Sequence, residues 1–229
     1  MDLESNLKSV RERIGNAAAK AGRDSHEIKL VAVTKRVEPE RMKQALTLGM
    51  DTFGENYAQE FRNKSKILEE QTDKEIKWHF IGQLQKNKVK YLVGKVELIH
   101  SLDSLSVAEE INKRAENMGI TVPVLLEVDT GGEESKGGVT PVLLESFLNE
   151  LSGLSAVEVQ GLMTMPPYFD DVEMARPYFI RLRELRDDLL PSFPNLQQLS
   201  MGMSGDFEVA IEEGATIVRV GSAIFGERN

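Results

Sequence analysis

Stretches of apolar residues with strand length alternate with amphipathic stretches along almost the whole chain. Seven strong apolar runs lie at 28–33, 77–81, 96–99, 122–128, 157–163, 198–201 and 216–220, with a weaker one at 52–53. Helical patterns lie between them, at 39–48, 56–70, 84–93, 105–118, 141–151, 172–190 and 207–213. Continuous apolar strands separated by helices are typical of a parallel sheet covered by helices.

Counted with the weak strand, the pattern contains eight strand-helix units, the number that closes a parallel sheet into a barrel. An open, doubly wound sheet is the alternative. A helix precedes the first strand, because Leu3, Leu7, Val10 and Ile14 recur at helical spacing. No Gly/Ser-rich or Pro-rich linker divides the chain. We therefore predict one α/β domain over 1–229, a modified (β/α)8 TIM barrel with an extra N-terminal helix.

Charge and composition argue against several classes of protein. The 28 Lys and Arg residues against 37 Asp and Glu residues give a net charge of −9, whereas nucleic-acid binding calls for a basic face. No long apolar span or secretion signal is present, so a cytoplasmic protein away from the membrane is expected. The absence of cysteine excludes disulfides and thiolate ligands. His26, His79 and His100 lack metal-ligand spacing, so no metal site is expected.

Lys35 ends the first predicted strand, and active sites of such barrels are built at the C-terminal ends of the strands. A lysine amine normally titrates near ~10.4. It becomes a nucleophile toward aldehydes where an apolar surround or a nearby cation favours the neutral form. The alternative interpretation is a solvated lysine at a strand end.

The loops after the last two strands have the composition of a phosphate site. We predict that Ser204 caps the helix that begins near 207, whose N-terminus offers N–H groups to an anion. Gly221 lets the backbone approach a ligand, and Ser222 adds a hydroxyl. Loops after strands seven and eight are the usual phosphate position in these barrels. Two capped helices without a ligand are the alternative, and Asp206 must point away from a phosphate.

Arg219 lies two positions before Gly221, so both face the barrel interior. A buried guanidinium needs a partner, which is either an acid at a strand end or a heteroatom of a ligand. A lysine, a phosphate cradle and an inward arginine together suggest pyridoxal 5′-phosphate (PLP). The cradle would take the phosphate, Lys35 the aldehyde carbon and Arg219 the pyridine nitrogen.

Two further polar residues have competing interpretations. Asn56 follows the second strand, but with Gln59 three residues later it also forms a capping pattern. The two roles are compatible. His79 lies within an apolar stretch, and we predict a hydrogen-bonded core histidine rather than an acid or base.

Six ordered stretches resemble the YggS/PROSC family of PLP homeostasis proteins over nearly the whole chain. They are AVTK at 32–35, FGEN at 53–56, WHFIGQLQKNK at 78–88, GLMTM at 161–165, LSMGMS at 199–204 and VRVGSAIFGER at 218–228. The resemblance implies a barrel like the N-terminal domain of alanine racemase with an extra leading helix.

The resemblance also implies roles for individual residues. The cofactor would be held by Lys35 through a Schiff base, by Arg219 at the ring nitrogen, by Asn56 beside the ring, and by Ser204, Gly221 and Ser222 at the phosphate. Asp129 departs from the pattern, because relatives commonly carry asparagine after the fifth strand. The departure concerns charge and hydrogen bonding at that wall of the site.

By resemblance, the function is to buffer PLP or deliver it, with PLP-dependent apo-enzymes as recipients. The alternative is a racemase-like enzyme. A racemase of that type carries a second, β-rich domain with a catalytic tyrosine, which we do not expect here because the chain ends at Asn229 after the eighth unit. A charged Arg219 also disfavours protonation of the ring nitrogen and weakens the electron sink. A Schiff-base aldolase acting on a sugar phosphate is a third reading.

Overall fold

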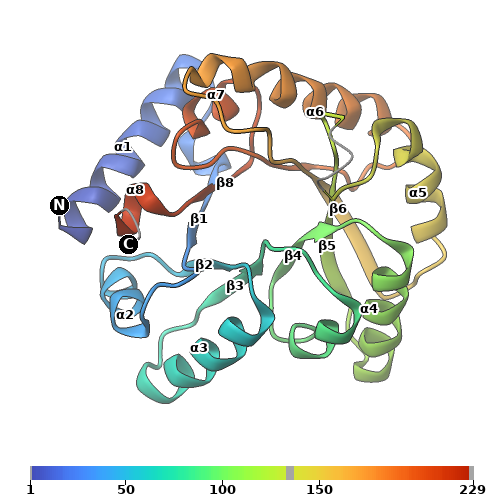
Figure 1. Ribbon diagram of the computed structural model, residues 1–229, viewed down its shortest axis with the longest axis horizontal. Coiled ribbons are helices and arrows are strands. Elements are labelled where there is room, and N and C mark those ends of the chain that lie inside the picture. Colours follow the sequence, from blue (N-terminus) through green and yellow to red (C-terminus); the bar gives the residue numbers. More distant parts are fainter. Residues whose placement is uncertain (1, 133–136, 227–229) are drawn as a thin grey trace.

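The computed structural model describes residues 2–132 and 137–226, and its eight parallel strands close into a barrel in the order of the sequence (Figure 1). The strands are β1 (Lys29–Val33), β2 (Thr52–Glu55), β3 (Lys77–Phe80), β4 (Leu98–Leu102), β5 (Val122–Glu127), β6 (Val157–Met163), β7 (Gln198–Ser200) and β8 (Ile217–Val220). Because β8 pairs with β1, the predicted barrel is confirmed and the open sheet is excluded. Residues 227–228, which end the motif at 218–228, lie outside the described residues.

Helices surround the barrel. The α-helices are α1 (Leu3–Lys20), α2 (Pro39–Thr47), α3 (Ala58–Gln71), α4 (Leu105–Met118), α5 (Leu144–Leu151), α6 (Arg176–Leu189), α7 (Phe207–Glu212) and α8 (Ser222–Phe225). Short 3-10 helices are η1 (Ser25–Glu27), η2 (Lys86–Tyr91), η3 (Pro141–Leu143) and η4 (Val172–Ala175). Across residues 2–132 and 137–226, none of the helices has the length and apolar character needed to cross a membrane.

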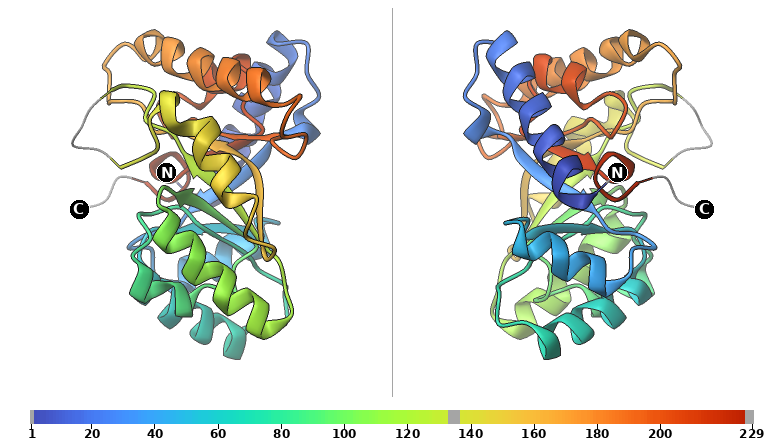
Figure 2. Two further views of the ribbon diagram at one scale, coloured as in Figure 1. Left: turned by 90° about the vertical axis from the view of Figure 1, so that its right-hand side faces the viewer. Right: turned by 90° about the vertical axis from the view of Figure 1, so that its left-hand side faces the viewer.

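The predicted leading helix is confirmed as α1, which lies beside the last elements of the chain (Figure 2). Its apolar stripe is buried, and the buried Asn6 amide donates to the Ile224 carbonyl at 2.9 Å. Arg13 binds the Glu208 carboxylate through two nitrogens, at 2.6 and 2.8 Å. Since α8 has four residues, it covers little of the barrel by itself, and α1 completes the outer layer there.

Two predicted elements differ from the observed ones. The segment predicted as a helix at 84–93 contains only the 3-10 helix η2, although Leu84, Val89, Leu92 and Val93 are all buried. The strand predicted at 96–99 is observed two residues later, at Leu98–Leu102. It includes His100 and Ser101, both buried, so polar residues inside the barrel concealed its end.

The main apolar core lies between the sheet and the helices, and a second, small apolar cluster is separate from it. It consists of Val31, Leu98, Leu125, Met163 and Ile217, each from a different strand. Strand alternation assigns these side chains to one face, the barrel interior. By the same alternation, Arg219 points inward one layer above Ile217. The interior therefore combines this apolar cluster with buried polar side chains, of which Arg219 lies toward the C-terminal ends of the strands.

Candidate functional site

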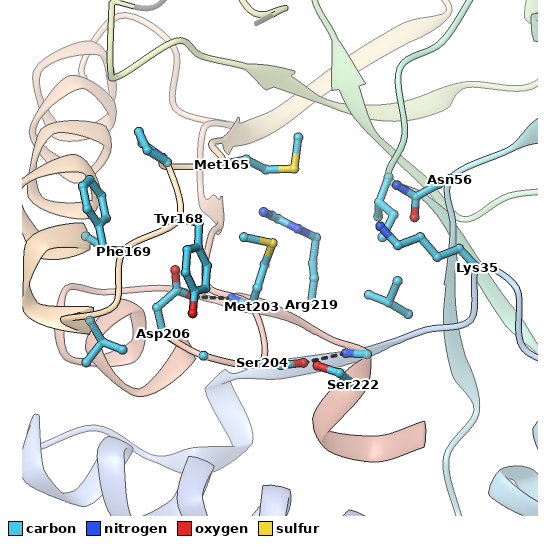
Figure 3. A pocket seen from close by; sticks show the side chains of 17 residues that line it. Lys35, Asn56, Met165, Tyr168, Phe169, Met203, Ser204, Asp206, Arg219 and Ser222 are labelled. Carbon is cyan, nitrogen blue, oxygen red and sulfur yellow. Dashed lines mark hydrogen bonds between the residues drawn. The ribbon is translucent and has the colours of Figure 1, made fainter. Parts of the chain in front are cut away.

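A cavity of about 530 Å³ opens where the strands end, within the size range of small-molecule sites (Figure 3). All six residues predicted to hold a ligand line it: Lys35, Asn56, Ser204, Arg219, Gly221 and Ser222. They come from the ends of β1, β2, β7 and β8. The structure thus brings together residues from opposite ends of the sequence, as the barrel predicts.

Lys35 reaches into the cavity from the end of β1, and Figure 3 shows its side chain near Asn56. The wall is largely apolar and includes Val33, Ile81 and Met165. An apolar wall suits an aromatic ligand and raises the free energy of a charged amine in it.

The backbone around Lys35 is fixed by side chains of α3. Arg36 has a positive φ of 59°, which is uncommon for a residue other than glycine and is retained where neighbours enforce it. The Lys64 amine donates to the Thr34 carbonyl at 2.6 Å, and Glu60 accepts the Arg36 N–H. These contacts set the direction in which the chain leaves β1.

Behind this turn lies a buried ion pair that the sequence analysis missed. The Lys64 amine lies 2.9 Å from Glu55 Oε1, and the Thr34 hydroxyl donates to the same oxygen at 2.7 Å. Burial raises the pKa of Glu55, although Lys64 and Thr34 oppose that shift. Its Oε2 is buried without a hydrogen-bond partner in the described part of the chain. The one sequence signal was an acid at an otherwise apolar strand end.

The loops after β7 and β8 are joined by Ser204. Its hydroxyl accepts from the N–H of Gly221 at 3.1 Å and of Ala223 at 3.3 Å. The predicted cap on α7 is therefore wrong. Asp206 occupies the capping position instead, and α7 has no capping side chain. The intervening turn leaves Ser204 two residues too early to reach the first N–H groups of α7, so its hydroxyl turns to the other loop.

Asp206 also lines the cavity. Its Oδ1 accepts the Met203 N–H at 2.6 Å, so this oxygen is turned to its own loop (Figure 3). Burial raises the pKa of Asp206, while the Met203 N–H and the charge of Arg219 act in the opposite direction.

Arg219 is 3% exposed and has no carboxylate within ion-pair distance among the described residues. One terminal nitrogen donates to the Ser200 hydroxyl at 2.5 Å and the other to the Thr164 carbonyl at 2.9 Å. The buried ion pair considered from the sequence is absent there. Burial lowers the pKa of Arg219 to about 10, with Glu127 and Asp206 opposing. The guanidinium is thus charged at neutral pH, and its hydrogen bonds go to the uncharged groups of Ser200 and Thr164.

Asn56 does not cap α3. The helix begins at Ala58 after Tyr57, whose backbone is extended and whose side chain makes no capping bond, so the capping prediction is wrong. Asn56 Oδ1 is buried without a hydrogen-bond partner in residues 2–132 and 137–226. A buried acceptor without a donor costs free energy, and a ligand in the cavity would relieve that cost.

His79 and Asp129 both lie outside the main cavity. His79 is fully buried, with Nδ1 2.7 Å from His100 Nε2, so the predicted core histidine is confirmed. Asp129 lines an adjoining cavity, and its Oδ1 accepts the N–H groups of Gly131 and Gly132, both at 2.9 Å. An asparagine oxygen accepts the same bonds, so the departure at Asp129 adds charge without altering this turn.

Comparison with known proteins supports the reading of the fold. The family described as "Alanine racemase, N-terminal domain" matches residues 3–229. The pyridoxal phosphate homeostasis protein of Aquifex aeolicus is 52% identical over 97% of this chain and 96% of its own length. The protein of the same name from Escherichia coli K12 is 34% identical over 100% and 97%.

Solved structures give the same picture. PipY of Synechococcus elongatus, determined with PLP bound, has a TM-score of 0.86 and 31% identity, covering 98% of this chain and 100% of its own. An alanine racemase of Clostridium difficile has a TM-score of 0.74 at 18% identity, covering 99% of this chain and 57% of its own. The second likeness is one of fold.

Proposed function

The chain belongs to the family of pyridoxal phosphate homeostasis proteins, which carry the alanine racemase N-terminal fold, and from that premise we propose a PLP-binding protein of homeostasis. The observation that carries the proposal is the convergence of Lys35, Arg219 and the Ser204 loop on one cavity. A relative with the same fold is solved with PLP in place.

The residues of the cavity fit the chemistry of this ligand. Ser204 and Ser222 provide hydroxyls beside the backbone N–H groups of the loop after β8, a set of donors suited to a phosphate. The guanidinium of Arg219 suits an acceptor such as a ring nitrogen. The Asn56 amide, whose Oδ1 has no hydrogen-bond partner in the part of the chain that the structure describes, lies beside Lys35. The apolar wall accommodates the aromatic ring.

Lys35 provides the covalent attachment in this proposal. Lys35 would hold PLP through its amine, which can condense with the aldehyde group of PLP to a Schiff base with loss of one water. The contacts of Lys64 and Glu60 with the turn at Thr34 and Arg36 support this role because they fix where the lysine leaves β1.

We infer a carrier rather than a racemase-like enzyme. Arg219 is charged at neutral pH and bound to Ser200 and Thr164. A cation at this position disfavours protonation of the ring nitrogen, which lowers the capacity of the ring to accept electrons. Racemases with the same fold also work with such an arginine. The charge of Arg219 therefore favours the carrier but does not by itself exclude an enzyme. The proposal includes a cytoplasmic location and PLP-dependent apo-enzymes as recipients.

Mapping of the attachment point tests the proposal. Protein loaded with PLP is reduced with borohydride and digested, and the modified peptide is identified by mass spectrometry. We expect one adduct, on Lys35, and a yellow protein whose visible band shifts on reduction. Lys35→Ala should lose the adduct, while Lys86→Ala, at an exposed lysine of η2, should keep it. An adduct on another lysine, or a colourless protein, would refute the proposal.

A second measurement separates the carrier from the enzyme. Loaded protein is incubated with one enantiomer of alanine and of several other amino acids, beside free PLP at the same concentration. The carrier predicts no racemisation above that of free PLP. Appreciable excess racemisation would make the protein an enzyme.

A further inference from the structure

A column of hydrogen-bonding side chains runs through the barrel from the wall of the cavity. The Arg219 guanidinium donates to the Ser200 hydroxyl at 2.5 Å, and the same hydroxyl lies 2.8 Å from His100 Nδ1. His100 Nε2 lies 2.7 Å from His79 Nδ1. The four residues come from β8, β7, β4 and β3, and none is more than 3% exposed.

The column ends at the opposite mouth of the barrel. His79 Nε2 makes no hydrogen bond within the described residues, but it lies 3.6 Å from Glu97 Oε1, close enough to sense the charge of that carboxylate. Glu97 Oε1 accepts the Lys29 amine at 2.9 Å. Lys29 begins β1 and Glu97 immediately precedes β4, so both lie at the N-terminal ends of the strands. Their side chains are 45% and 41% exposed. The hydrogen-bonded column therefore runs from the cavity to His79, which faces an ion pair in contact with solvent.

The negative charge of Glu97 beside His79 Nε2 favours a proton on that nitrogen, since a carboxylate offers only lone pairs. With its proton on Nε2, neutral His79 accepts at Nδ1. The Ser200 hydroxyl in turn donates to His100 Nδ1 and accepts from Arg219 with a lone pair. His100 then carries its proton on Nε2 and donates to His79 Nδ1, and His79 directs Nε2–H toward Glu97. The reverse order would set a bare nitrogen of His79 against the carboxylate.

Both histidines are held neutral in this arrangement. Burial lowers the pKa of His100 well below its usual value, and the neighbouring His79, Arg219 and Lys29 act in the same direction. Burial also lowers the pKa of His79; there Glu97 opposes the shift and Lys29 adds to it. Two neutral rings in one tautomer transmit a fixed direction of donation from one mouth to the other.

We propose that Ser200, His100 and His79 are positioning residues, which hold the Arg219 guanidinium against the ring of bound PLP and link it to the Lys29–Glu97 pair at the far mouth. What Arg219 faces rests on the proposed function, whereas the bonded column does not. The role follows from the partners of Arg219, since without a carboxylate its orientation depends on the Ser200 hydroxyl and the Thr164 carbonyl.

The column transmits the electrostatic effect of Glu97 to Arg219 without any movement of the backbone. The Glu97 carboxylate polarises each donor toward it, which makes the Ser200 oxygen a better acceptor for Arg219. Loss of that negative charge leaves the guanidinium less neutralised. A more positive guanidinium disfavours a protonated ligand beside it, so the pH midpoint of the visible band of bound PLP should fall.

Nitrogen NMR of the histidines in the protein without PLP tests the column itself. The chain has three histidines, and the third, His26, is exposed. We expect His79 and His100 as neutral Nε2–H tautomers whose shifts stay constant across neutral pH. Glu97→Gln should move the nitrogen shifts of His100, two links away, whereas Glu69→Gln, at an exposed acid of α3, should not. An Nδ1–H tautomer at either buried ring, or His100 shifts unchanged in Glu97→Gln, would overturn the column.

The pH profile of PLP-loaded protein tests the positioning role. In Glu97→Gln the midpoint of the visible band should fall by about half a pH unit or more, with Glu69→Gln and His26→Gln matching the unmodified protein. A midpoint equal in all four proteins would refute the link to the ligand. Failure of every protein to bind PLP would instead refute the proposed function, and the tautomers would still decide the column.

Discussion

Lys64 and Glu55 form an ion pair within the wall of the barrel, with the amine 2.9 Å from Oε1. Lys64 is 6% exposed and Glu55 fully buried, and the same amine holds the Thr34 carbonyl beside Lys35. A helix lysine that looks like surface charge in the sequence thus fixes the backbone next to Lys35, the proposed attachment point.

Removal of this lysine should be costly. Lys64→Met leaves the buried carboxylate of Glu55 without its counter-charge, and breaking such a pair costs about 3–5 kcal/mol of unfolding free energy. Urea unfolding measures the loss. Lys66→Met, at an exposed lysine on the same helix, should change the free energy of unfolding by less than about 0.5 kcal/mol. Equal losses in the two variants would contradict the buried role of Lys64.

Ser204→Ala should weaken phosphate anchoring. The variant loses the acceptor for the N–H groups of Gly221 and Ala223 and a hydroxyl for the phosphate. One such bond to a charged group predicts about a tenfold higher Kd for PLP. Pyridoxal, which lacks the phosphate, is the control ligand, and its Kd should be unchanged. A similar loss for both ligands would show disruption of the loops in general.

The loop after β7 contains two glycines, of which one tolerates an added side chain and the other does not. Gly202 has a φ of +91°, and an added Cβ would lie 2.6 Å from Ala210 Cβ and 2.9 Å from Phe207 Cα. Gly205 has nothing within 4 Å of that position. Gly202→Ala should cost about 2 kcal/mol or more in thermal or urea unfolding, while Gly205→Ala should be nearly neutral. Comparable stability of the two variants would contradict this account.

The lowered pKa of Glu97 leads us to expect a loss of folding stability in acid. The imidazole of His79, and then Lys29, hold the pKa of Glu97 at about 2, below its usual 4.5. A depressed folded pKa means that the unfolded chain takes up the proton first. The stabilisation by Glu97 is therefore present above about pH 4.5 and is lost as the pH falls toward 2. The stability difference between the unmodified protein and Glu97→Gln should shrink across this range, and a constant difference would exclude the effect.

The sequence predicted the barrel and the location of its six candidate residues because strand order determines which loops meet. Lys35 and Arg219 follow from the positions of β1 and β8 alone. Individual hydrogen bonds did not follow. Ser204 and Asn56 are both residue types that commonly cap helices. Neither caps a helix here, because the local backbone directs their side chains away from the helix N-terminus. The direction of that backbone depends on packing between loops.

The interior column was beyond sequence reasoning for a related reason. His79 and His100 are 21 positions apart, and His100 and Ser200 are 100 apart. Only the closed barrel places them in one line. The polar residues of β4 even shortened the predicted strand, because periodicity counts apolar residues and this interior is partly polar.

The pairing of β1 with β8 has a consequence for the stage at which PLP can bind. Lys35 is translated well before Arg219, Gly221 and Ser222. Until β8 is made and pairs with β1, the proposed attachment point therefore lacks the wall proposed to hold the phosphate and the ring. On this proposal, stable binding of PLP requires the closed barrel.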